Sequence, residues 1–63
     1  MTLREYIKDS RPPRIAILIL QDDDSVVSIE YDKTEYEDIN NELMEREVMD
    51  TSEEEDLVEV WLR

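Results

Sequence analysis

Carboxylates are the main chemical resource of this sequence. The chain has 19 Asp and Glu among its 63 residues, and it has neither His nor Cys. Without imidazole or thiol groups, zinc sites of the usual kind, thiol nucleophiles and imidazole bases are excluded. Carboxylates alone could serve in acid–base catalysis or bind a hard cation, but both tasks need side chains that converge on one point.

The three consecutive acids Asp22 to Asp24 are the first candidate site. A calcium loop alternates its acidic ligands and needs a Gly at its sharp turn, whereas these acids are adjacent and the chain has no Gly. Adjacent side chains point in different directions, so we expect a solvated turn and no metal site. Nothing places a pair of carboxylates in a pocket, and there is no Gly-rich phosphate loop. We therefore predict a protein that is not an enzyme and uses no metal or cofactor.

The second candidate site is an acidic surface in the C-terminal part of the chain. Residues 1–14 carry four bases and two acids, whereas residues 15–63 carry three bases and 17 acids, a net charge of −14. A net charge of about −2 to −8 is already enough to keep a small domain soluble. The selected acids come from one predicted helix and one predicted turn, and they are Glu35, Asp38, Glu42, Glu45, Glu53, Glu54, Glu55 and Asp56.

This acidic surface has two interpretations. A charged run is usually only a solvated face. Carboxylates spaced along a helix and a turn can also imitate the phosphate rows of a duplex, and would then occupy a basic nucleic-acid channel on another protein. The negative charge attracts basic partners, and it disfavours direct binding to nucleic acid or to an anionic membrane.

Trp61 is the third candidate. Alternation along the last segment puts Val58, Val60 and Leu62 on one face and Leu57 and Trp61 on the other. An exposed Trp is enriched at interfaces, but both faces of the sheet could equally be covered within the fold. A homodimer formed through the Leu57/Trp61 face satisfies both interpretations.

The elements that position these candidates follow from periodicity and capping. We expect a helix over residues 2–10, with Thr2 and Glu5 forming a capping box, and strands over residues 14–20 and 26–32 that form a hairpin. A second helix is expected over residues 34–46, then a short extra strand at Glu47 to Asp50 and a final strand. The sequence thus predicts one α+β domain spanning residues 1–63, in α-β-β-α-β order, with two helices packed on an antiparallel sheet of three to four strands.

The first apolar residues are interrupted by Arg4, Glu5 and Lys8, so we expect no signal peptide. The longest apolar run, Ile15 to Leu20, is far shorter than the roughly 20 residues that span a bilayer. We expect a cytoplasmic protein.

The two ends of the chain resemble small acidic proteins encoded by phages and prophages of low-GC Gram-positive bacteria. The similarity covers "MTLREYI" and "NELMEREVMDTSEEEDLVEVWL". The matching positions are Thr2, Leu3, Glu5, Leu43, Arg46, Glu47, Val48, Glu55, Asp56, Leu57 and Val58. The resemblance implies a phage or mobile-element origin, inside a bacterial host, and some such proteins are anti-CRISPR inhibitors that block a basic nuclease groove. It carries over no functional residue.

Two functions are therefore expected. The first is an acidic inhibitor that occupies a basic nucleic-acid-binding surface of another protein, such as a CRISPR nuclease, by charge mimicry. The second is a self-associating assembly module of a phage that uses the Leu57/Trp61 face.

Overall fold

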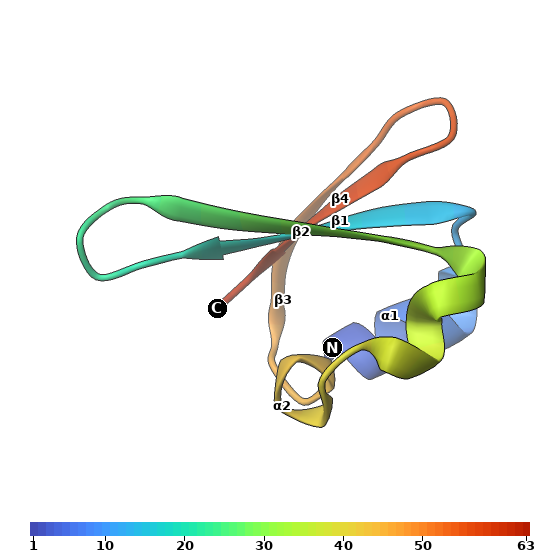
Figure 1. The fold of residues 1–63 in the computed structure, drawn as a ribbon, viewed down its shortest axis with the longest axis horizontal. Coiled ribbons are helices and arrows are strands. Elements are labelled where there is room, and N and C mark those ends of the chain that lie inside the picture. Colours follow the sequence, from blue (N-terminus) through green and yellow to red (C-terminus); the bar gives the residue numbers. More distant parts are fainter.

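The computed structural model describes all residues from 1 to 63 as a four-stranded sheet with short helices on one side (Figure 1). In chain order the elements are α1 (Leu3–Ser10), β1 (Arg14–Leu20), β2 (Val26–Asp32), the 3₁₀ helix η1 (Lys33–Asp38), α2 (Asn41–Met44), β3 (Val48–Glu53) and β4 (Val58–Leu62). The predicted α+β class, the first two strands and their hairpin are confirmed. No helix is long and apolar enough to cross a membrane.

The sheet is mixed, so the prediction of an antiparallel sheet is only partly correct. Its strand order is β2-β1-β4-β3. The two hairpins, β1–β2 and β3–β4, are antiparallel, but the central strands β1 and β4 run parallel. These two strands are the most apolar segments of the chain, and placing both in the centre buries each of them between two neighbours.

The core lies between the sheet and the helices. Ile15, Ile17 and Val60 are completely buried on the sheet face that α1 covers. Nine buried residues form this core: Leu3, Tyr6, Ile7, Ile15, Ile17, Ile39, Val58, Val60 and Leu62. The predicted inward triplet Val58, Val60 and Leu62 is therefore confirmed.

Helix α1 begins and ends as its sequence predicts. The Thr2 hydroxyl accepts a hydrogen bond from the Glu5 N–H at 3.3 Å, and the Glu5 carboxylate accepts from the Thr2 N–H at 3.0 Å. The helix ends at Arg11, which has a left-handed backbone with φ 40° and donates its N–H to the Ile7 carbonyl. Pro12 then prevents continuation of the helix.

The predicted helix over residues 34–46 is wrong. The segment divides into η1 and α2, separated by Ile39 in an extended conformation. Asp32 and Asn40 cap the two pieces through their side chains, accepting from the N–H groups of Thr34 and Glu42 at 2.9 and 2.7 Å. Asp and Asn compete for local backbone bonds in this way and so begin new helices. Thr34 and Glu37 have the spacing of a capping box, but Asp32 is the N-cap and forms the capping box with Glu35 instead.

The extra strand predicted at Glu47 to Asp50 exists but is longer. Strand β3 runs to Glu53, and its pairing with β4 shifts register between Val48 and Asp50. Glu47 also forms an isolated bridge with Thr2, which ties this end of β3 to the start of α1.

Candidate functional site

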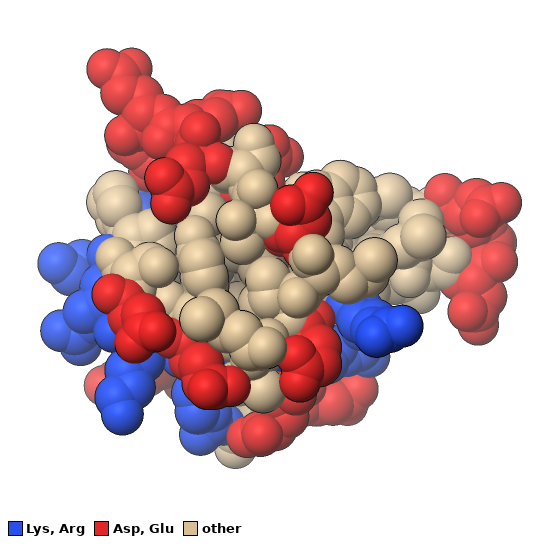
Figure 2. All heavy atoms as spheres, turned by 180° about the vertical axis from the view of Figure 1, so that it is seen from behind, with Lys and Arg blue, Asp and Glu red and all other residues tan.

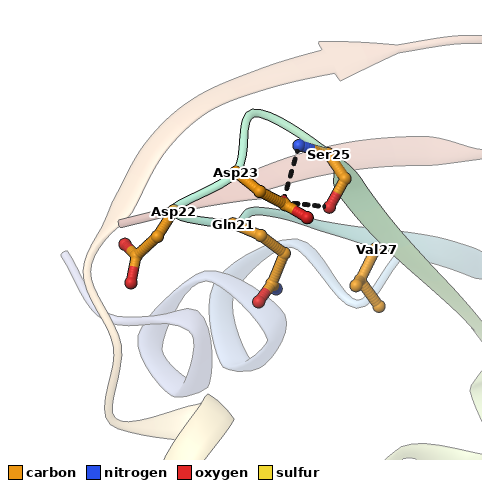
Figure 3. A pocket seen from close by; sticks show the side chains of 5 residues that line it. All are labelled: Gln21, Asp22, Asp23, Ser25 and Val27. Atoms are coloured by element: carbon orange, nitrogen blue, oxygen red, sulfur yellow. Dashed lines mark hydrogen bonds between the residues drawn. The ribbon is translucent and has the colours of Figure 1, made fainter.

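The acidic turn of the first hairpin is stabilised by its own side chains (Figure 3). The Asp23 carboxylate accepts hydrogen bonds from the Ser25 N–H at 3.1 Å and the Ser25 hydroxyl at 2.6 Å. These bonds hold the pKa of Asp23 below its ordinary value. The Asp22 side chain points away from that of Asp23, and Asp24 takes the left-handed conformation, with φ 69°, that a chain without Gly must assign to another residue. This geometry explains the acids as turn formers.

The four candidate acids of residues 34–46 do not share one helix face. Glu35 lies in η1, where its carboxylate accepts the Asp32 N–H at 3.1 Å. Glu42 pairs with Arg46 at 3.2 Å, and Glu45 pairs with Arg4 of α1 at 3.0 Å. Only Asp38 has neither a hydrogen bond nor an ion pair. Two of these four acids therefore have their charge compensated within the molecule.

The run Glu53 to Asp56 remains uncompensated. Glu53 ends β3, and the next three acids form the turn into β4, closed by a hydrogen bond of 2.8 Å from the Glu54 N–H to the Leu57 carbonyl. All four acids are exposed. No Lys or Arg lies within ion-pair distance, since the four ion pairs of the molecule involve other acids.

Acidic side chains dominate two projections of the molecular surface. Figure 2 shows that these projections, at the tips of the two hairpins, carry red acidic side chains, whereas red and blue side chains are mixed over the lower part of this face. The strongest uncompensated negative charge therefore lies at the β3–β4 and β1–β2 turns. It does not lie on a helix.

The Leu57/Trp61 face of the sheet carries no helix. All helices lie on the opposite side (Figure 1). Ala16 and Leu18 are nevertheless buried there, and the half-buried Trp61 is the neighbour of Leu18 in the parallel β1–β4 pair. Leu57 is also half-buried and comes just before β4. The structure thus places Trp61 beside the buried Leu18 on the face without helices, whereas Leu57 lies in the turn before β4.

Sequence reasoning missed a basic groove between α1 and the η1–α2 segment. Its volume is about 470 Å³, and its lining residues are Arg4, Ile7, Lys8, Arg11, Tyr36 and Met44. The Tyr36 hydroxyl donates to the Pro12 carbonyl, and burial raises the pKa of Tyr36. The sequence feature that indicates this groove is the spacing of Arg4, Lys8 and Arg11, which suits one face of a helix. Lys8 and Arg11 have no acidic partner, so an anion could bind here.

Comparisons of the chain with protein-family models, with curated proteins and with solved structures found no match.

Proposed function

We propose that this protein is a non-enzymatic inhibitor of phage or mobile-element origin, similar to anti-CRISPR proteins. It would occupy a basic nucleic-acid-binding surface of another protein by charge mimicry. The observation that carries the proposal is the net charge of −14 over residues 15–63, together with its display on exposed turns that lack ion pairs.

The mimic surface would be centred on Glu53 to Asp56. Four consecutive exposed carboxylates at the end of a hairpin can enter a groove without displacing internal ion pairs. Glu42 and Glu45 would contribute less, because Arg46 and Arg4 already neutralise them. Asp38 and Glu35 would lie in a second contact region.

The test is capture of a basic target from a bacterial host, followed by competition. Binding should weaken steeply with salt and should be lost when duplex DNA or guide RNA is added. Replacing Glu54, Glu55 and Asp56 by Gln, Gln and Asn should weaken binding roughly tenfold, at a few tenths of a kcal/mol or more for each charge.

The matched control removes the same number of charges at the other hairpin, by changing Asp22, Asp23 and Asp24 to Asn. This variant should bind nearly as well as the wild type. Salt-insensitive binding that nucleic acid does not compete would refute charge mimicry, and an equal loss in the control would refute a site at Glu53 to Asp56.

The second candidate function is an assembly module that uses the Leu57/Trp61 face. Its supporting observation is that no helix covers this face, although it carries buried Leu18 beside Trp61. It predicts an oligomer that Trp61→Ala dissociates and that charge removal at the turns leaves intact, as measured by sedimentation.

A further inference from the structure

The outer edge of β2 has unpaired backbone groups. In an antiparallel pair, residues alternate between those that bond to the neighbouring strand and those whose N–H and C=O point away. Hydrogen bonds from Lys33 to the Pro13 carbonyl and from Gln21 to the Ser25 carbonyl mark both ends of the β1–β2 ladder. Counting inward by two from each end gives Ile17 and Ile29 as a bonded pair.

The residues between the bonded positions therefore point their N–H and C=O groups outward, and these are Val26, Ser28, Glu30 and Asp32. Asp32 confirms the direction, because its N–H is met by the Glu35 carboxylate at 3.1 Å. The other three residues have no partner on that side, since β2 is the edge of the sheet.

This edge lacks several of the features that usually prevent strand pairing, although it carries the acids Glu30 and Asp32. Strand β2 pairs with β1 without a register shift and contains no Pro and no Lys. By contrast, the β3 edge has a register shift, and its first residue, Val48, bonds to the Met1 carbonyl. Leu20, Val26 and Val27 near the tip of the first hairpin are 58%, 46% and 41% exposed, so an apolar patch adjoins the free edge.

We propose that β2 pairs antiparallel with β2 of a second copy, with Ser28 on the two-fold axis. This register joins Ser28 to Ser28 and Val26 to Glu30, so every outward N–H and C=O of these three residues is bonded. On the other side of the strand, Val27 packs beside Ile29 of the second copy. No like charges lie directly opposite between residues 26 and 30, although the same register continued to the end of β2 places Asp32 opposite Asp24 of the second copy.

Two alternative self-pairing registers are worse. An axis at Glu30 places two carboxylates opposite each other. An axis at Ile29 pairs Val26 with Asp32, whose N–H is already bonded to Glu35. With the axis at Ser28, Lys33, which has no ion pair in the single chain, comes opposite Asp23 of the second copy and offsets the repulsion between Asp32 and Asp24. The three free residues of one β2 strand are bonded by the same three residues of the other, and this self-complementarity favours a second copy over an unrelated strand.

The test uses the absence of cysteine from the chain. A bonded antiparallel pair has a Cα separation of about 5.5 Å, which a disulfide can span. Under mild oxidation, Ser28→Cys should therefore form a covalent dimer. Two control variants should cross-link much less. In Glu30→Cys, the two copies of residue 30 lie about 13 Å apart, because each faces residue 26 of the other strand. In Ser52→Cys, the new cysteine lies on β3, at the opposite edge of the sheet.

Sedimentation at micromolar to millimolar concentration gives the second measurement. Ser28→Pro removes the N–H on the two-fold axis without removing a hydrogen bond to β1, so it should raise the dissociation constant of the dimer about tenfold or more. Ser28→Ala is the control, because it keeps this N–H and should leave the dissociation constant unchanged. Added salt should strengthen the dimer by screening the repulsion of two acidic copies. A chain that stays monomeric throughout, equal cross-linking at Ser28 and Ser52, or dissociation by Trp61→Ala and not by Ser28→Pro would each overturn the proposal.

Discussion

Val→Ala substitutions at one buried and one exposed position of the sheet test whether the apolar packing is concentrated under the helices. Val60 is completely buried in β4 under the helices, whereas Val26 in β2 is 46% exposed. Both substitutions remove the same methyl groups from a strand, so the change in strand propensity is similar at both sites.

The expected costs differ severalfold. At Val60 the lost burial amounts to about 1.6 kcal/mol, at about 0.8 kcal/mol for each methyl, and the cavity left behind raises the total to about 2–3 kcal/mol. At Val26 about half of the burial is absent already, so the cost should stay below about 1 kcal/mol. A domain of this size is stable by roughly 3–9 kcal/mol, so Val60→Ala should remain folded over most of this range but unfold at a clearly lower urea concentration.

Urea unfolding followed by circular dichroism measures both values. The protein must be kept at low micromolar concentration, because pairing of β2 edges would bury Val26. The urea dependence of the free energy of unfolding should be unchanged, since the surface exposed on unfolding is nearly the same. Equal costs at Val26 and Val60 in the monomer would show that the hairpin tip is covered and that the packing described here is wrong.

Three further outcomes are expected. Tyr6→Phe should leave the free energy of unfolding unchanged or raise it, because the buried Tyr6 hydroxyl has no hydrogen-bond partner. Tyr36→Phe should instead lower it by about 1 kcal/mol, because it removes the hydrogen bond to the Pro12 carbonyl. Chemical unfolding of the two variants compares these values. Hydrogen bonds from Thr34 hold the pKa of Asp32 below its ordinary value, so the stability from this cap is present above about pH 4 and is lost as pH falls further; Asp32→Asn should flatten the decline of Tm in acid. Replacing Arg11, with φ 40°, by Gly should raise stability by up to about 1 kcal/mol in the same unfolding assay, because Gly has no Cβ to resist the left-handed conformation.

The parts of the fold that local sequence signals specify were predictable. The capping box of Thr2 and Glu5 gave the start of α1, and unbroken β-branched or alternating patterns gave β1 and β2 with their observed bounds. The helix over residues 34–46 failed because the spacing of Tyr36, Ile39 and Leu43 suits one long helix as well as two short pieces. What decides between them is the capping by Asp32 and Asn40.

Two features could not be predicted from local sequence signals: the relative direction of the central strands β1 and β4, and which acidic side chains form ion pairs. Alternation along β4 identifies its buried face but contains no information on whether its neighbour runs parallel. The ion pair between Arg4 and Glu45 joins residues far apart in the chain and exists only because α1 packs beside α2. Composition therefore located the negative charge but could not show which carboxylates remain free to act.

The proposed inhibitor and the proposed dimer are compatible in one geometry. Strands β2 and β3 lie at opposite edges of the sheet, so pairing through β2 leaves Glu53 to Asp56 exposed on both copies. The two β3 strands would be separated by seven strand spacings, at most about 34 Å at 4.8 Å each, which is close to one turn of a DNA duplex. The dimer would thus present two acidic turns at a spacing close to the helical repeat of a DNA duplex. Ser28→Pro, which removes the dimer, should then weaken binding to a target with two basic grooves. Binding to a target with a single basic groove should be unchanged.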